Sequence, residues 1–333
     1  MPVFPYILLF ISLMPALQGG VRVEHLAAPL LVGFAGIRAT RVHVDLLWPI
    51  GGLFFGLVVL GLSTRLSWQA GLFADPFTMF VRVLLPGLLL LAFPAILMGV
   101  SRPLLHTCNA IIAGAIFVAV LTLLTLVGGS WGDWIVFWVS VEADSVWSAA
   151  LDIGRVTGIF GQPLEAGIFY SVSLFAIVIA WRTQGSWQHR VFLLIGLGAT
   201  LVGGGLSLSK NFLFLGLGGA GALALMIGVI SLTRAWVIGI PVSLLILNFG
   251  FQYNQNYFDS LYDLYREGGF ITAASAGRFG LQESQVALLF SDITDGSDWL
   301  VGKGLGSFLP LDSGYLEFYY QGGALAMTGY VIF

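Results

Sequence analysis

Long apolar runs separated by short polar gaps occupy most of the chain. Most of these runs are long enough for a helix to cross roughly 30 Å of hydrocarbon, and the shortest is also predicted to cross. The runs cover residues 3–18, 24–37, 46–62, 80–100, 108–128, 166–181, 190–206, 211–231, 234–250 and 314–333. The pattern predicts an all-α polytopic membrane protein with about ten transmembrane helices, because helices satisfy their own backbone hydrogen bonds in lipid.

Two connections are much longer than the others, residues 129–165 and residues 251–313. The second contains two amphipathic segments, 251–270 and 276–290, whose apolar side chains recur at helical spacing. A Gly-Gly pair separates them. We therefore expect a single transmembrane domain, residues 1–333, in which 251–313 forms a large outer loop that carries short surface helices.

The short polar gaps differ in charge between the two predicted sides of the membrane. If the loop at 251–313 lies outside, strict alternation places inside the gaps near 36–45, 101–107, 182–190 and 232–235. These gaps hold Arg38, Arg41, Arg102, Arg182, Arg190 and Arg234, and Asp45 is their one carboxylate. Because Lys and Arg in short loops mark the inner side, this orientation is the predicted one.

Composition supports a membrane protein and excludes other classes. The chain is 58% hydrophobic and 9% charged, against roughly 25% charged in a soluble domain. A net charge of -3 without a basic stripe excludes a nucleic-acid partner. The single cysteine, Cys108, is predicted to be a packing residue. The first run lacks a basic n-region and is interpreted as a membrane segment, and the apolar last residues suggest that C-terminal helices are missing.

Three short motifs have two interpretations each. GLGGAGAL (216–223) and GKGLGS (302–307) resemble phosphate loops, but neither lies in a strand–loop–helix unit. We interpret the first as small-residue helix packing and the second as a backbone bend. SDITDGSDWL (291–300) has three aspartates that could hold calcium, but it lacks the EF-hand order. A solvated turn is the preferred interpretation there.

The predicted outer side also carries cations that the orientation rule does not require. They are Arg155, Lys210, Arg266, Arg278 and Lys303. Lys210 lies in the polar gap of GGGLSLSKNFLF (203–214), with no acidic residue near it in sequence. A lysine at a helix end can extend its ammonium group to the membrane surface, which is the simplest explanation. Several such cations together favour a common functional reason.

Four stretches, in order, resemble the bacterial O-antigen polymerase and O-antigen ligase superfamily. They are GRVTGIFGQPLEAGIFYSVSLF (154–175), LSLSKNFLFL (206–215), AGRFGLQESQVALL through LVGKGLGSF (276–308) and DSGYLEFYYQGGALAMTGY (312–330). The resemblance covers about residues 150–333. It implies an integral glycosyltransferase of the bacterial inner membrane that acts on polyprenyl-pyrophosphate-linked glycans, with its large loop in the periplasm.

The resemblance also implies roles for individual residues. The Arg-x-Thr-Gly-x-Phe pattern of the family falls on residues 155–160, and its Ser-Arg pair falls on Ser209 and Lys210. Lysine keeps the charge there but loses the bidentate fork of arginine. The loop arginine of the family falls on Arg278. Arg155, Lys210 and Arg278 are therefore expected to bind pyrophosphate and stabilise it as the leaving group, without a metal ion or cofactor.

The acceptor hydroxyl of such a reaction needs a general base, for which a carboxylate in a partly desolvated cleft is suited. Asp312 falls where the ligases of the superfamily carry histidine, and it is the first candidate. Glu165 and Glu317 are the others, each with a structural alternative. Glu165 would stabilise a helix N-terminus, and Glu317 would pair with a cation such as Lys303.

Tyrosines of the outer segments are candidates for glycan binding, because their ring faces suit the C–H bonds of sugars. The candidates are Tyr257, Tyr265 and Tyr315, and an aromatic membrane anchor is the alternative for the first two.

The absence of histidine between residues 190 and 333 favours an inverting polymerase of undecaprenyl-pyrophosphate-linked units over a ligase. A flippase or transporter of lipid-linked oligosaccharide is the more distant alternative. A chain-length regulator is a further candidate partner beside the lipid bilayer.

Overall fold

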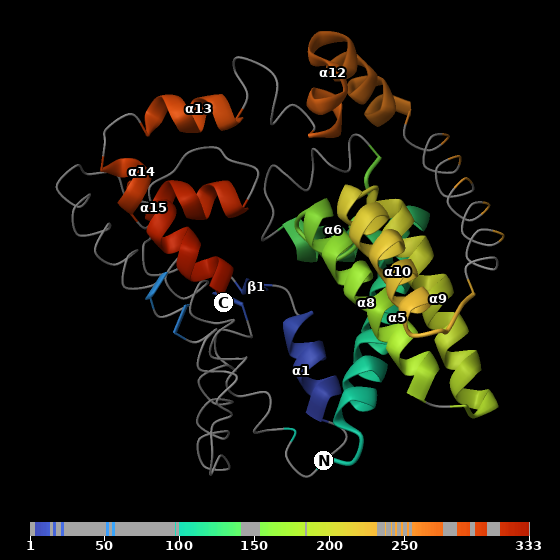
Figure 1. The fold of residues 1–333 in the computed structure, drawn as a ribbon. Coiled ribbons are helices and arrows are strands. Elements are labelled where there is room, and N and C mark those ends of the chain that lie inside the picture. The colour runs from blue at the N-terminus through green and yellow to red at the C-terminus, as the bar shows by residue number, and fades with distance from the viewer. Residues whose placement is uncertain are drawn as a thin grey trace. The chain divides into compact units, whose positions relative to one another are not determined.

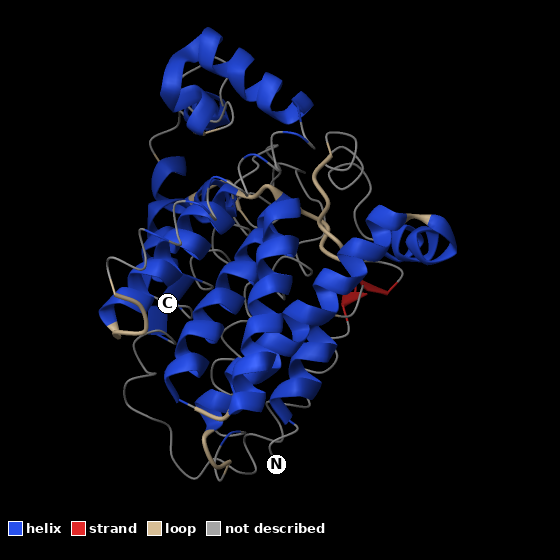
Figure 2. Ribbon diagram, turned by 90° about the vertical axis from the view of Figure 1, so that its right-hand side faces the viewer, coloured by secondary structure: helices blue, strands red, loops and turns tan. Residues whose placement is uncertain are grey.

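The protein is described here by a computed structural model, which is helical over most of the residues that it describes (Figures 1 and 2). It describes residues 4–13, 16–17, 21–22, 100–140, 154–183, 185–231, 255–275, 285–293, 297–304 and 314–332, with isolated positions between 51 and 97 and between 237 and 252. The chain divides into two compact units. Unit 1 comprises Met1–Glu24 and Gly99–Phe258, and unit 2 comprises His25–Met98 and Asp259–Phe333.

Unit 1 is built on three long apolar helices that pack against one another, α5 (Pro103–Val127), α8 (Pro163–Thr183) and α9 (Trp187–Ser207). They contain 25, 21 and 21 residues and are long and apolar enough to cross a membrane. The shorter π-helix η3 (Phe212–Gly219) continues into α10 (Ala220–Met226). Helices are thus confirmed in four of the predicted apolar runs. The chain is mostly helical with three candidate membrane spans among its described residues.

The apolar run at 3–18 was expected to form one spanning helix, and this expectation is wrong. Helix α1 contains only nine residues, Phe4–Ser12. The short strand β1 (Ala16–Leu17) follows it and pairs antiparallel with β2 (Val21–Arg22). Pro15 explains the early end, because the residue before a proline is disfavoured in helical conformation. A helix of nine residues rises only about 14 Å. It packs instead on α5, where the rings of Phe10 and Phe117 are 6.2 Å apart.

Helix α5 ends where two glycines adopt positive φ. Gly128 and Gly129 have φ of 71° and 76°, a region that residues with a Cβ disfavour. A second helix, α6 (Gly129–Ser140), follows inside the connection that the sequence left without predicted helices. Cys108 is buried in the core on α5, as predicted.

Small residues set the spacing between the helices of unit 1. A Cβ at Gly203 of α9 would overlap the ring of Tyr170, and one at Gly204 would overlap the ring of Phe212. Tyr170 and Phe212 are themselves fully buried and meet edge to face, with ring centres 6.4 Å apart. The backbones of α8, α9 and η3 therefore approach closely, as small residues allow in membrane helices.

Contacts along α8 show the direction of its neighbours. Gly167 lies against Ser209, Ser171 against Gly216, and Phe175 against Gly219. Helix α8 and the η3–α10 helix therefore run parallel, while α9, which joins them, runs antiparallel to both. The GLGGAGAL stretch lies inside this packed helix, which confirms that it is a helix-packing motif.

Helices form in the second long connection, within the segments whose amphipathic spacing predicted them. Helix α12 (Gln255–Ala274) contains a break at Gly269, where φ is 78°. Helix α13 (Gln285–Asp292) and the single turn α14 (Asp298–Val301) follow it. The break predicted at the Gly-Gly pair is confirmed at Gly269, and helix is present in both amphipathic segments. The part of the second segment before Gln285 lies outside the described residues.

Helix α15 (Gly314–Ile332) was expected to be one transmembrane helix, but its course breaks at Gly323, with φ 63° and ψ -167°. The break leaves carbonyl groups without helical partners, and the segment after α14 supplies donors to them. The backbone N–H of Lys303 donates to Tyr320 O at 2.8 Å, and that of Gly304 donates to Gln321 O at 2.9 Å. The GKG part of GKGLGS therefore bends back onto α15, which confirms the predicted backbone bend.

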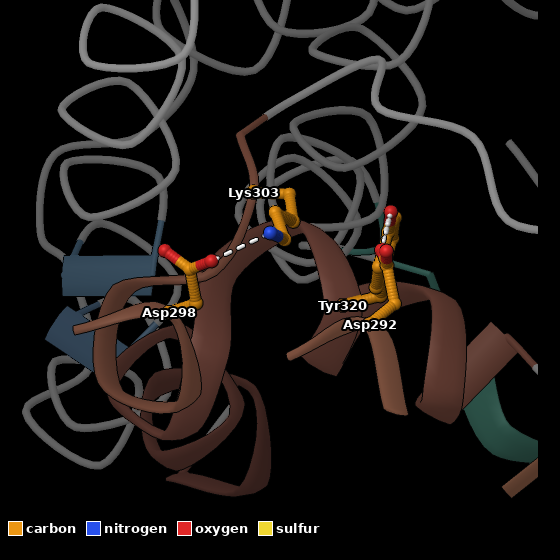
Figure 3. A network of polar contacts seen from close by, with 4 residues as sticks. All are labelled: Asp292, Asp298, Lys303 and Tyr320. Atoms are coloured by element: carbon orange, nitrogen blue, oxygen red, sulfur yellow. Dashed lines mark hydrogen bonds and ion pairs between the residues drawn. The ribbon is translucent and has the colours of Figure 1, made fainter. Parts of the chain in front are cut away.

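Side chains reinforce the same junction (Figure 3). The Tyr320 hydroxyl donates to Asp292 Oδ2 at 2.5 Å, and Lys303 Nζ lies 2.6 Å from Asp298 Oδ2. Two of the three aspartates of SDITDGSDWL thus contact side chains of the protein. The preferred interpretation of this stretch as a solvated turn does not hold for these two residues.

Replacing Gly302 with alanine is expected to destabilise unit 2. Gly302 has φ of 75°, and a Cβ there would overlap the Gln321 carbonyl. A clash between backbones that cannot repack should lower the free energy of unfolding by about 1–3 kcal/mol. Gly269→Ala is the matched control, because Gly269 has φ of 78° with nothing within 4 Å of the added methyl. In thermal unfolding of detergent-solubilised protein, the midpoint temperature should fall further for Gly302→Ala than for Gly269→Ala. Equal decreases would contradict a packing role for Gly302.

Candidate functional site: a cationic turn at one end of unit 1

Three segments of unit 1 meet at the end where α9 stops. They are the loop 154–162, the first turn of α8 and the turn at 207–211 that joins α9 to η3. A Cβ at Gly167 in α8 would overlap the Ser209 side chain, so α8 and the turn are in direct contact. This end of the bundle carries three of the predicted site residues, Arg155, Glu165 and Lys210.

Arg155 holds the C-terminal end of α9. Its Nε donates to Ser207 O at 3.3 Å, and its Nη2 donates to Leu208 O at 3.4 Å. The backbone N–H of Val156 donates to Leu206 O at 3.1 Å. The last carbonyls of a helix lack helical partners and carry partial negative charge, which makes a guanidinium group favourable there.

The rest of the predicted Arg-x-Thr-Gly-x-Phe pattern shapes the loop. Thr157 Oγ1 donates to Phe160 O at 2.7 Å, which closes a tight turn. Gly158 has φ of 63° and lies against Thr122 of α5, where a Cβ would overlap the threonine hydroxyl. Threonine and glycine at these positions thus fold the loop against α5 and present Arg155 to α9.

The turn at 207–211 is strained at one residue. Leu208 has φ of 46° and ψ of 34°, in the left-handed region that residues other than glycine disfavour. Its N–H donates to Gly205 O at 3.1 Å. The carbonyl of Ser209 then accepts from the N–H groups of Phe212 and Leu213, at 3.0 and 3.3 Å, which starts the next helix.

Lys210 therefore lies in the first turn of a new helix, and it is half-buried. The N-terminal end of a helix carries partial positive charge and attracts anions. A lysine there adds to the positive potential instead of neutralising it. The helix end, Lys210 and the nearby Arg155 all favour a negatively charged ligand.

Glu165 lies in the first turn of α8, two residues after Pro163, as predicted. A carboxylate at this position stabilises the helix N-terminus. It also places an acidic group at the same end of the bundle as the cations. Both interpretations of Glu165 remain, because its position satisfies each.

Two basic residues of the predicted inner gaps, Arg182 and Arg190, lie at the other end of unit 1. Arg182 lies in the last turn of α8 and Arg190 in the first turn of α9, and Arg182 Nη1 is 3.8 Å from the position that a Cβ on Gly228 would take. Ser207 follows Arg190 by seventeen positions along the helix, a rise of roughly 26 Å. The predicted inner and outer cations of this unit therefore lie at opposite ends.

Two of the predicted outer cations have structural partners in unit 2. The Arg266 guanidinium lies 5.2 Å from the centre of the Tyr262 ring, as a cation–π contact. Lys303 pairs with Asp298. The side chain of Glu317, which the sequence proposed as a partner of Lys303, lies outside the described side chains. Tyr262 and Arg266 are four positions apart, and side chains at this spacing lie on the same face of a helix. The sequence therefore contained a signal for this contact.

Other predicted site residues lie beyond the described side chains. Arg278 and Asp312 fall outside the described residues. Tyr257 lies in α12, and Tyr315 and Glu317 lie in α15, with backbones described but not side chains. Of the predicted glycan-binding tyrosines, Tyr265 is described and is 53% exposed. Its neighbour Tyr262, which is not among the predicted glycan-binding residues, is 56% exposed.

Within the described ranges, no group of three side chains of the metal-binding types comes together. Comparison of the chain with models of protein families, with curated proteins and with solved structures finds no match.

Proposed function

We propose that the chain is an inner-membrane glycosyltransferase that polymerises undecaprenyl-pyrophosphate-linked oligosaccharide units into O-antigen, capsule or exopolysaccharide. The observation that carries the proposal is the cationic turn at 207–211, which contains Lys210 and accepts hydrogen bonds from Arg155, at one end of a bundle of apolar helices. A lipid-linked diphosphate has its anionic group at the membrane surface and its chain in the hydrocarbon. A cationic site at the end of apolar helices is suited to both parts.

The reaction joins the hydroxyl of one unit to the anomeric carbon of another. The C–O bond to the pyrophosphate breaks as the new glycosidic bond forms, and polyprenyl pyrophosphate leaves with the electron pair. Attack from the face opposite the leaving group inverts the anomeric configuration. Fixed cations in a site of low dielectric stabilise the charge that develops on the pyrophosphate, which is the role that the resemblance implies for Arg155, Lys210 and Arg278. The proposed reaction uses no metal ion or cofactor.

The hydroxyl proton goes to a carboxylate that acts as general base. Asp312 is proposed first, on the resemblance of its position to that of the ligase histidine. Glu165 is supported by its place in the first turn of α8, which lies against the cationic turn. Glu317 is the third candidate.

The glycan is proposed to contact the outer tyrosines, Tyr257, Tyr265 and Tyr315. The exposure of Tyr265 supports this role, because a sugar ring needs an open aromatic face. Donor and acceptor glycans, the bilayer and a chain-length regulator are the proposed partners.

Reconstitution tests the reaction. The purified chain in vesicles, given one lipid-linked repeat unit and no other acceptor, is expected to produce a ladder of glycan lengths on gel electrophoresis. Movement of the unit across the bilayer without bond formation would identify a flippase. Transfer only after addition of a second acceptor would identify a ligase. Either of these results would overturn polymerisation.

A further inference from the structure

We infer that Arg155 acts as a positioning residue, which holds the turn at 207–211 so that Lys210, rather than Arg155 itself, binds the diphosphate. The inference rests on the proposed function for the identity of the anion. It assigns different roles to Arg155 and Lys210, whereas the sequence pattern gives both the same role.

The contacts of Arg155 point to this role. Its Nε and Nη2 groups donate to two successive carbonyls, Ser207 O and Leu208 O, at 3.3 and 3.4 Å. Only a guanidinium has parallel donors that match such a pair, since an ammonium group is a single point charge. The two carbonyls lie immediately before Ser209 and Lys210, so their orientation determines where the next helix begins.

The strain at Leu208 explains why the turn needs hydrogen bonds from Arg155 to keep its conformation. Leucine with φ of 46° is held in a conformation that it rarely adopts alone. Such a residue persists only where surrounding contacts determine it. Arg155 binds the carbonyl of this residue, and Gly205 accepts its N–H. Without the guanidinium, we expect Leu208 to relax and the start of the next helix to move.

A single-cysteine assay separates positioning from direct binding. Asn211→Cys in a Cys108→Ala background places one thiol beside Lys210. Its rate of alkylation by a water-soluble maleimide reports the conformation of the turn, and protection by inorganic pyrophosphate reports binding. Adding Arg155→Gln is expected to change the alkylation rate. It should also weaken pyrophosphate protection about tenfold, because a displaced Lys210 loses its charge-assisted contact with the anion.

Rescue by glycine is the decisive measurement. Glycine adopts positive φ without strain, so Leu208→Gly should restore the turn when Arg155 is absent. In the Arg155→Gln protein, Leu208→Gly is expected to return pyrophosphate protection to within about threefold of the parent value. If Arg155 binds the phosphate directly, Leu208→Gly cannot replace the lost charge, and failure of the rescue overturns the inference.

Arg102→Gly is the matched control. Arg102 is the other described residue besides glycine with positive φ, at 56°, and it lies before the first turn of α5. It precedes Thr122, against which the loop of Arg155 packs, by twenty positions along α5. Relief of strain at Arg102 should not rescue Arg155→Gln.

A double-mutant cycle gives a second test. If Arg155 acts through Lys210, the protein with both Arg155→Gln and Lys210→Gln should bind pyrophosphate no more weakly than Lys210→Gln alone, within about twofold. Independent phosphate ligands would give effects that multiply, which would overturn the inference. An unchanged alkylation rate in Arg155→Gln would do the same. If the parent protein shows no pyrophosphate protection, the proposed function fails, while the alkylation rates still decide whether Arg155 holds the turn.

Discussion

Lys210→Ala is expected to abolish glycan chain extension in reconstituted vesicles, while Lys210→Arg retains it. Lys210 lies in the first turn of the helix that follows the strained turn, where the helix end and the lysine both favour an anion. Removing one preorganised group that stabilises a developing charge costs roughly 10²–10³ in turnover. Arginine keeps the charge and adds a fork that suits phosphate oxygens.

The amounts of protein in the membrane should be equal for the parent chain, Lys210→Ala and Lys210→Arg, as judged by quantitative blotting of vesicles. Lys303→Ala is the matched control, because Lys303 is paired with Asp298 in unit 2. It removes the same charge but should leave chain extension largely intact. Normal extension by Lys210→Ala would mean that this lysine only extends its ammonium group to the membrane surface.

Gly203→Ala is expected to lower the stability of unit 1 by about 1–3 kcal/mol, the usual cost of overpacking a core. The added methyl would overlap the ring of Tyr170, which is fully buried between α8 and α9. The ring packs edge to face on Phe212, at the start of η3. Moving it would therefore disturb the same helix that carries Lys210, so activity should fall together with the melting temperature.

Gly198→Ala on the same helix is the control. Nothing lies within 4 Å of a Cβ at Gly198, so the change adds a better helix former without a clash. Thermal unfolding of detergent-solubilised protein should show a lower midpoint for Gly203→Ala and an equal or higher one for Gly198→Ala. Similar losses at both positions would mean that α9 tolerates no methyl for reasons other than contact with Tyr170.

Hydropathy predicted the long helices of unit 1 well. Helices α5, α8 and α9 begin and end within a few residues of the expected apolar runs. A helix in lipid must satisfy its own backbone groups, so its position depends on local composition that a sequence displays directly. Local chemistry also indicated the helix start at Pro163 and the break before Phe270.

The same argument missed the break in α15. Residues 314–333 are apolar throughout most of their length, yet Gly323 adopts positive φ. Donors from Lys303 and Gly304 satisfy the carbonyls beside the break. These partners lie about twenty residues earlier in the chain, so no periodicity within the apolar run could reveal them. Hydropathy records where a segment avoids water but not which distant backbone replaces a helical hydrogen bond.

The sequence by itself determined that this is a helical protein suited to a membrane, with Arg155 and Lys210 beside the same end of its apolar helices. Charge and hydropathy are properties of single residues, and they need no partner to be recognised. Only the tertiary structure decided that the guanidinium of Arg155 faces the last carbonyls of α9 and that Leu208 is held in a strained conformation. Hydrogen-bond direction and backbone strain depend on segments some fifty residues apart meeting in one place, which residue spacing does not encode.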